Sequence, residues 1–384
     1  MESSSTGEMR FDWQGTLVLI HGAVLEEMGR EFPYSSSKPI TISEIELSDP
    51  HESEILVRIE TAGICHSDLA VVQGVRPRPT PMLLGHEAAG IVEKVGSGVS
   101  NLKIGDRVVM TFSPRCGNCK GCSSNGQFSC INGTTSNVAG DLLSGGSRLS
   151  RDNSPLFHHL GVSGFATHAV VDHRSVVQVS SDVPSSIAAL LGCAVLTGGG
   201  ALINAVTVKP GQSIAVVGLG GVGMAGLITA LALAHGDVYG IDLNPARRAT
   251  ALELGATAVF DVQSAIAEKL LADVVLEAAG VAKAFEASLN ILAPGGTLVT
   301  VGLPAPTDLA TISPLTLVAQ GKTIVGSYLG SSVASRDIPI FVDLWRSGKL
   351  PIESLVSSTI TLDEINTGMD RLASGAELRQ MINF

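Results

Sequence analysis

The sequence has no run of basic residues, and acidic side chains outnumber basic ones. It contains 25 lysine and arginine residues against 36 aspartate and glutamate residues, which gives a formal net charge of −11 at pH 7. Nucleic acids and anionic membrane surfaces attract proteins non-specifically through positive charge. The composition therefore argues against both as partners.

The sequence also lacks segments that would direct the chain to a membrane or anchor it there. Its start, MESSSTGEMR, is polar and has no apolar core of a signal peptide. The most apolar stretch, residues 227–234, is too short to cross a bilayer. We expect a cytoplasmic protein whose residues 1–15 form a mobile tail.

Length and composition predict a folded protein with two domains. The chain has 384 residues, more than twice the length of a typical domain. Hydrophobic residues make up 45% and charged residues 16%, enough for a sizeable core. Cysteine is scarce, with six in all, and in a cytoplasmic protein these residues indicate metal binding or catalysis more often than disulfides.

The second half of the sequence predicts a doubly wound parallel sheet of the α/β class. Short β-branched segments alternate with Ala- and Leu-rich helical segments from Ser213 to about Tyr328. One helix is expected from Gly221 to about His235, and another from Pro245 to a stop at Gly255. Strands are expected at residues 213–218, 238–242, 258–260, 273–277, 297–302 and 323–328.

The rest of the sequence predicts a compact β-rich domain. Residues 40–180 contain strand-like runs separated by Gly, Pro and Ser, and residues 132–154 are expected to form an irregular loop. The segment after about Leu329 has no glycine fingerprint and is expected to return to this domain. The predicted division is residues 1–194 and 329–384 for the discontinuous β-rich domain, and residues 195–328 for the doubly wound one.

A glycine-rich turn indicates a dinucleotide site. The sequence GLGGVG follows a predicted strand and opens a predicted helix, where glycines allow a tight turn and close approach to a pyrophosphate. The helix N-terminus then offers free N–H groups to the phosphates. The expected contacts are Gly218, Gly220, Gly221, Val222 and Gly223.

An acidic residue in this region favours NAD over NADP. Asp242 ends the next predicted strand, where a carboxylate binds the adenosine ribose hydroxyls and repels a 2′-phosphate. The alternative role for Asp242 is a helix cap before Pro245. Arg247 is expected beside the same ribose, with a solvated helix arginine as its alternative.

Four cysteines lie within fifteen residues of a Gly-rich segment. Cys116, Cys119, Cys122 and Cys130 have the spacing C-x2-C-x2-C-x7-C, and four thiolates can enclose one tetrahedral zinc ion. A closed shell leaves no position for substrate, so this site would be structural and would order the lobe of residues 113–131. An iron–sulfur cluster and disulfides are the alternatives.

The other two cysteines acquire a role only together with a histidine. Taken alone, Cys65 and Cys193 are better explained as small buried side chains than as ligands. His86 lies between them in the sequence, and two thiolates with one imidazole make a three-ligand zinc set with an open fourth position. The alternative for His86 is a core or surface histidine without a ligand role.

These motifs in combination resemble the zinc-dependent alcohol dehydrogenases of the medium-chain dehydrogenase/reductase family. Residues 85–99, GHEAAGIVEKVGSGV, are similar to the family's zinc signature G-H-E-x2-G-x5-G-x2-V at every fixed position. GICHSD and LLGCAVLTGGG resemble its first and third ligand segments. The resemblance covers about residues 40–384 and implies a GroES-like catalytic domain joined to a Rossmann domain.

The resemblance implies a role for each site residue. Cys65, His86 and Cys193 would hold the catalytic zinc, with Glu87 beside it, while Asp68 would orient His86. Ser67 would accept the alcohol proton, but Ala70 stands where many relatives have a histidine that continues the relay, so water or another base must replace it. The remaining implied contacts are His66, Thr197, Val301 and Arg379 for the cofactor, and Phe112 for the substrate pocket.

The implied reaction is reversible oxidation of a primary or aromatic alcohol by NAD in a homodimer joined through its nucleotide-domain sheets. Arg76 and Thr134 replace the acidic residue and the arginine of the glutathione-dependent formaldehyde dehydrogenases, which argues against that activity. A polyol dehydrogenase is disfavoured by Cys193, where such relatives commonly have glutamate. A zinc-free reductase is disfavoured by the four-cysteine lobe. A non-enzymatic binding protein is the remaining alternative.

The two cysteine groups predict a metal content. Elemental analysis of the purified protein should find about two zinc ions per chain, one for the four-cysteine set and one for the three-ligand set. A content of one or none would contradict this assignment.

Overall fold

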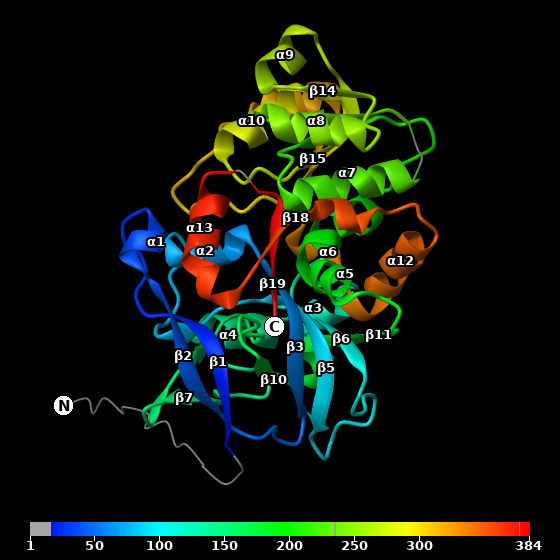
Figure 1. Ribbon diagram of the computed structural model, residues 1–384. Helices are drawn as coiled ribbons and strands as arrows, with labels where there is room; N and C mark the ends of the chain where they lie inside the picture. The colour runs from blue at the N-terminus through cyan, green and yellow to red at the C-terminus, as the bar shows by residue number, and fades with distance from the viewer. Residues whose placement is uncertain (1–16, 234–235, 376) are drawn as a thin grey trace, which may run out of the picture.

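The computed structural model describes residues 17–233, 236–375 and 377–384. The expected N-terminal tail and the expected end of the first helix at His235 lie outside these residues. Three sheets organise the described chain, two in its β-rich part and one in its α/β part. Figure 1 shows the α/β part above and the β-rich part below.

The α/β part is a six-stranded, all-parallel sheet in the order β14-β13-β12-β15-β16-β17. This order is that of a dinucleotide-binding fold, with the first strand, β12, at the centre. Both β12 and the helix after it, α7, are apolar and largely buried, as expected where helices cover both faces of a parallel sheet. The strands are β12 (Ile214–Val217), β13 (Val238–Ile241), β14 (Ala258–Phe260), β15 (Ala272–Glu277), β16 (Leu292–Thr300) and β17 (Thr323–Gly326). The helices are α7 (Gly221–Leu233), α8 (Pro245–Glu253), α9 (Val262–Ala267), α10 (Ala282–Asn290) and α11 (Pro314–Gln320).

The larger sheet of the β-rich part joins the two ends of the chain. Its central strand β3 pairs with β5 along one side, and with β10 and then β19 along the other. Figure 1 shows the C-terminal strand β19 beside β3, so this sheet combines segments from both ends of the described chain, and the predicted fold class is confirmed. The strands are β3 (Glu54–Ile64), β5 (Glu87–Val95), β6 (Arg107–Met110), β10 (His168–Asp172), β11 (Val176–Val179), β18 (Val356–Ile360) and β19 (Arg379–Asn383).

The smaller sheet of the β-rich part has the order β8-β7-β2-β1-β4-β9. Its strands are β1 (Val18–Leu25), β2 (Ile40–Leu47), β4 (Met82–Leu83), β7 (Leu149–Arg151), β8 (Ser154–Pro155) and β9 (Phe157–His158). The remaining α-helices are α1 (Tyr34–Ser37), α2 (His66–Val72), α3 (Lys120–Ser123), α5 (Ser185–Leu190), α6 (Leu196–Gly200), α12 (Ala334–Arg346) and α13 (Ile365–Ala373).

The expectation of an irregular loop at residues 132–154 is wrong. The segment contains most of helix α4 (Ile131–Ala139) and strand β7. The Cys130 thiol caps α4 by accepting from the Gly133 N–H, and Gly140 ends it in the left-handed conformation. Inside the helix, Asn137 donates to the Phe112 carbonyl at 2.7 Å. These contacts stabilise a helix that its Ser-, Thr- and Asn-rich composition does not predict.

The longest apolar helix of the described residues is not at residues 227–234 but at residues 185–205. The continuous helix Ser185–Ala205 has the length and apolarity of a membrane span, but 83% of its apolar stretch is buried within the protein. A core helix meets the same criterion, so it is weak evidence for a membrane. The middle of this helix, Leu191–Val195, is a π-helical turn. Such turns are frequent at functional sites.

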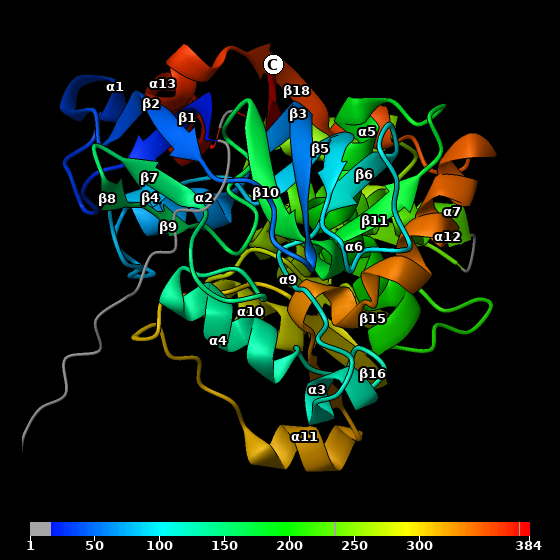
Figure 2. The same ribbon diagram turned by 90° about the horizontal axis from the view of Figure 1, so that it is seen from below.

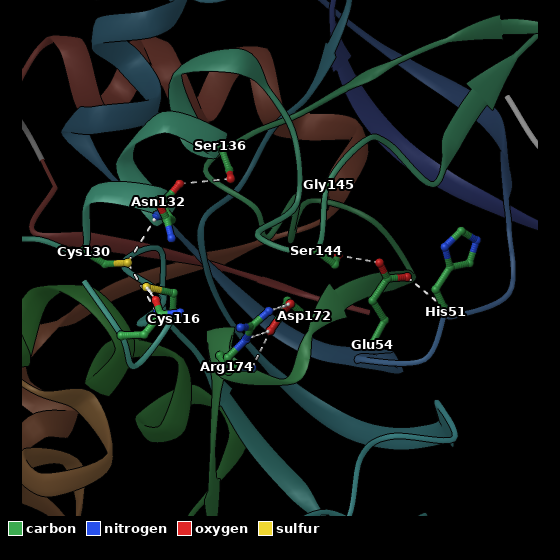
Figure 3. A network of polar contacts seen from close by, with 12 residues as sticks. His51, Glu54, Cys116, Cys130, Asn132, Ser136, Ser144, Gly145, Asp172 and Arg174 are labelled. Carbon is green, nitrogen blue, oxygen red and sulfur yellow. Dashed lines mark hydrogen bonds and ion pairs between the residues drawn. The ribbon is translucent and has the colours of Figure 1, made fainter. Parts of the chain in front are cut away.

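A buried ion pair anchors the loop before β7 to the start of β3. Arg148 donates to both carboxylate oxygens of Glu54, at 2.9 and 2.7 Å, and Glu54 is fully buried. Figure 3 shows Glu54 also contacting Ser144 and the His51 backbone. The pair therefore connects the two β-rich sheets.

Removing one member of this pair should destabilise the protein. Arg148→Met leaves the Glu54 carboxylate buried without its cation, and the free energy of unfolding should fall by about 3 kcal/mol. Urea-induced unfolding measures the change. Arg346→Met is the control, because Arg346 pairs with Asp182 at the surface and its loss should matter little. Equal unfolding curves for the two variants would contradict the structural role of Arg148.

Candidate active site

A cavity of about 1100 Å³ lies between the α/β part and the β-rich part. It opens at the carboxyl ends of β12 and β13, where dinucleotide-binding folds take their ligands. Most of the predicted site residues line it: Cys65, His66, Ser67, Phe112, Cys193, Thr197, Gly218, Gly220, Gly221, Val222, Asp242, Arg247, Val301 and Arg379.

The structure brings the predicted three-ligand set together at one end of this cavity. Cys65 follows β3 and caps α2, while Cys193 lies in the π-helical turn. Single ligand atoms of Cys65, His86, Glu87 and Cys193 all lie within 4.8 Å of one another, and all four residues are buried. Two thiols, an imidazole and a carboxylate around one point are a donor set that suits zinc.

Asp68 holds the imidazole in place from behind. One carboxylate oxygen lies 2.9 Å from His86 Nδ1, and the other accepts the Cys65 backbone N–H at 2.9 Å. This contact turns His86 Nε2 toward Cys193 Sγ, 3.5 Å away. Burial raises the pKa of Asp68, but its contacts with His86 and His159 outweigh that effect and lower it overall. The position is the one expected for an orienting carboxylate.

His159 is a member of this group that sequence reasoning missed. Its Nδ1 lies 3.2 Å from the Asp68 carboxylate, and its ring packs edge-on against His86 with 5.4 Å between centroids. It also lines the cavity. His159 has no ligand-like spacing to Cys65 or His86 in the sequence, so only the fold reveals it.

Glu87 is the least satisfied polar group of the centre. Both of its carboxylate oxygens are buried, without a hydrogen-bond partner among the described residues. Burial raises the pKa of Glu87 to about 7, although Arg379 Nε lies 3.4 Å from one oxygen. Unpartnered carboxylate oxygens in a dry site are expected where a cation completes the group. The residues present therefore fit a metal ion.

Arg379 connects this centre with the glycine-rich turn. Its Nη2 donates to Cys65 Sγ at 3.5 Å, and its guanidinium packs so closely on Gly221 that a side chain there would clash. A hydrogen bond from Cys193 lowers the pKa of the Cys65 thiol well below its usual value, and Arg379 lowers it further. Cys65 is thus prepared to be a thiolate, the form that binds metals, while the same hydrogen bond raises the pKa of Cys193.

The four-cysteine lobe has the dimensions of a single-ion site. Sulfur–sulfur distances are 3.9 Å for Cys116–Cys122, 3.6 Å for Cys119–Cys122 and 3.8 Å for Cys119–Cys130. Sulfurs bound to one zinc at 2.3 Å lie about 3.8 Å apart at tetrahedral angles. All four cysteines are free, and disulfide sulfurs would be about 2.05 Å apart, which excludes the disulfide alternative.

Backbone N–H groups surround the lobe sulfurs. Those of Cys122 and Ile131 both point at Cys119 Sγ from 3.4 Å, and they lower its pKa to about 6. Cys116 donates its N–H to Cys130 Sγ at 3.3 Å, the contact visible in Figure 3. These bonds stabilise thiolates and so favour a cation at their centre.

At the other end of the cavity the glycine fingerprint has the conformation that its residues predict. Gly218 has a φ of +88°, and a side chain at Gly223 would overlap the Gly218 carbonyl oxygen at 1.7 Å. Only glycine permits this turn and the close packing of α7 beneath it. The N-terminus of α7 consequently faces the cavity.

The structure separates the two roles considered for Asp242. Its carboxylate accepts the Leu219 N–H at 2.6 Å and the Asn244 N–H at 2.7 Å, and it lines the cavity. Helix α8 is capped by Asn244 instead, so the helix-cap alternative for Asp242 is wrong. Arg247 lies 3.7 Å from Asp242 and donates to the Gly375 carbonyl, which makes it a cavity residue and not a solvated one.

The wall next to the metal-ligand set is aromatic. Phe112 packs edge-on against His86, with 5.3 Å between centroids, and Tyr328 packs edge-on against Phe112 at 5.8 Å. Ser67 and Ala70 line the same cavity. Sequence reasoning identified Phe112 but missed Tyr328, which a predicted strand at residues 323–328 had placed inside the sheet.

Family models and solved structures match most of the chain. The model for the alcohol dehydrogenase GroES-like domain matches residues 51–181, and the model for zinc-binding dehydrogenases matches residues 221–346. An alcohol dehydrogenase zinc-binding domain protein from Burkholderia ambifaria is 31% identical, with a TM-score of 0.88 over 96% of this chain and 100% of that one.

Two enzymes with printed activities are also similar. Benzyl alcohol dehydrogenase from Acinetobacter calcoaceticus is 30% identical, with a TM-score of 0.87 over 96% of this chain and 100% of that one. The alcohol dehydrogenase TADH from Thermus sp. ATN1 is 25% identical, with a TM-score of 0.75 over 94% and 99%.

Proposed function

Because the chain belongs to the zinc-dependent alcohol dehydrogenases of the medium-chain dehydrogenase/reductase family, we propose that it interconverts an aromatic primary alcohol and its aldehyde with NAD. One observation carries the proposal. A single cavity joins the buried set of Cys65, His86 and Cys193 to the glycine-rich turn, and an aromatic wall lies next to that set.

The chain's residues divide the chemical work. Zinc held by Cys65, His86 and Cys193, with Glu87 beside it, would polarise the substrate oxygen, and NAD would exchange hydride with the substrate carbon. Ser67 lies beside Cys65 in the cavity wall, where its hydroxyl can accept the alcohol proton. Ala70 cannot take that proton further, so water or another base must complete its release.

The aromatic wall supports aromatic substrates. Phe112 packs beside His86 and Tyr328 packs beside Phe112, and substrate rings pack favourably edge-on or offset against such walls. The similar structure from Acinetobacter calcoaceticus is a benzyl alcohol dehydrogenase. Both observations favour a benzyl-type alcohol over a polyol.

The four-cysteine lobe and the division of the chain belong to the same proposal. The lobe would hold a second, structural zinc ion, as its sulfur–sulfur distances support. The proposed domain boundaries at residues 194 and 328 fall on either side of the parallel sheet, whose strands run from Ile214 to Gly326.

We further propose a homodimer joined through the α/β sheets. β17 is an edge strand, and the adjoining α11 exposes Leu315 and Val318 by 78% and 83%. Figure 2 shows α11 at the margin of the molecule. A second copy would pair the free strand edge and cover these side chains. Light scattering after size-exclusion chromatography should give twice the mass of the chain, and a monomer would contradict the arrangement.

The zinc-loaded protein should oxidise benzyl alcohol with NAD, and Cys65→Ser should lower kcat by about 10³-fold or more. The variant loses one thiolate ligand of the zinc ion. As a Lewis acid, this ion would stabilise the transition state by several kcal/mol. NADH absorbance measures turnover, and NADH fluorescence measures cofactor binding, which should remain. Parallel loss of NADH binding would indicate structural collapse, and no turnover by the unmodified protein would refute the proposed function.

Asp242→Asn should reduce the preference for NAD over NADP. The amide oxygen can still accept the Leu219 N–H, but the charge that binds ribose hydroxyls and repels a 2′-phosphate is lost. We expect binding of NADH to weaken about tenfold, since hydrogen bonds to charged groups are worth ~1.5–3 kcal/mol. Asp237→Asn, beside the opposite end of β13, is the control. An unchanged ratio of NADH to NADPH affinities would exclude a ribose role.

A further inference from the structure

Two arginines in the cavity wall have no role in the reaction proposed above. Arg76 and Arg78 both line the cavity. Neither forms an ion pair with any residue in the described part of the chain, and Arg78 Nε is buried without a hydrogen-bond partner there. A partly buried cation without a counter-charge is unfavourable unless a ligand supplies one.

The backbone that carries both arginines is restricted, and a side-chain contact also holds the Arg76 guanidinium. They belong to the segment RPRPTP, residues 76–81, in which every second residue is a proline that restricts its own φ and the residue before it. The Arg76 backbone N–H donates to the Ala70 carbonyl at 3.0 Å, and its Nη2 donates to the Leu303 carbonyl across the cavity at 2.6 Å. The other N–H groups of its side chain stay available to a ligand.

Both arginines line the same cavity as the aromatic wall next to the metal-ligand set. In this wall, Tyr328 packs against Phe112, and Phe112 packs against His86. Burial raises the pKa of Tyr328, and the charges of Arg76 and Arg78 both act in the opposite direction. The two guanidiniums therefore share the cavity with the rings against which an aromatic substrate would pack.

The two cations also repel each other. Burial lowers the pKa of Arg76, and the charge of Arg78 contributes in the same direction. An anion between them would relieve this repulsion, and guanidinium groups bind carboxylate or phosphate oxygens in a bidentate manner.

We propose that Arg76 and Arg78 form an anion-binding subsite, and that the substrate is an aromatic alcohol or aldehyde with a carboxylate or phosphate remote from the reacting carbon. This inference rests on the proposed function, because it places the reacting carbon at the zinc end of the cavity. The ring would lie along Phe112 and Tyr328, and the anion would reach the two arginines.

Matched substrates test the subsite in the zinc-loaded enzyme. The kcat/KM for 3- and 4-(hydroxymethyl)benzoate should exceed that for benzyl alcohol about tenfold or more, while 4-(hydroxymethyl)benzamide should gain nothing. 4-(Hydroxymethyl)phenyl phosphate distinguishes a phosphate from a carboxylate. Arg76→Gln and Arg78→Gln should each remove most of the preference through KM and leave benzyl alcohol within about threefold. Arg346→Gln, an equal charge change outside the cavity, should change neither.

A binding measurement separates this inference from the proposed reaction. Calorimetry should show 4-carbamoylbenzoate binding to the enzyme–NADH complex about tenfold tighter than benzamide, and Arg78→Gln should abolish the difference. If benzyl alcohol is oxidised without any preference for the anionic substrates, the subsite is refuted and the proposed function stands. Absence of all turnover refutes the proposed function. The comparison of 4-carbamoylbenzoate with benzamide by calorimetry still decides whether the arginines bind an anion. Weaker NADH binding by both variants would assign the arginines to the cofactor and overturn the proposal.

Discussion

The contact on which the site depends is the pairing of β19 with β3. Gln380 pairs with Ile64, the residue before Cys65, so the adjacent Arg379 enters the centre formed by Cys65 and Glu87. The same guanidinium packs on Gly221 at the start of α7. One buried cation thereby neutralises thiolate and carboxylate charge, and it fixes the distance between the metal-ligand set and the dinucleotide turn.

The cavity is a basic region in an acidic protein. The chain has a net charge of −11, yet this one cavity is lined by two carboxylates and five cationic side chains, those of Arg76, Arg78, Arg247, Lys283 and Arg379. The charges concentrate where anionic groups are expected, since a low-dielectric cleft strengthens local fields. The pyrophosphate of the proposed cofactor would account for the cations near the glycine-rich turn. It would not account for Arg76 and Arg78, which line the same cavity.

Sequence patterns predicted the parallel sheet well and the β-rich part less well. Each strand of the parallel sheet is a short apolar run between helices, a local signal that survives folding unchanged. β16 begins at Leu292, earlier than expected, because Pro294 and Gly295 disguise its first half. Helix α4 was missed for a different reason. Its cap is the Cys130 thiol and its anchor is the Phe112 carbonyl, and neither contact has a signature in helix propensity.

The sequence by itself determined what depends on neighbours along the chain. Four cysteines within fifteen residues can only gather locally, and a Gly-rich turn after a strand has one common conformation, so both sites could be predicted. Only the tertiary structure decided what depends on distant segments. It joined Cys65 to Cys193 through the π-helical turn, placed His159 beside Asp68, and set Arg76 and Arg78 in the same cavity wall as Tyr328. These groups meet because packing of the sheets and helices closes long loops around a shared cavity, and no local spacing records which residues will face it.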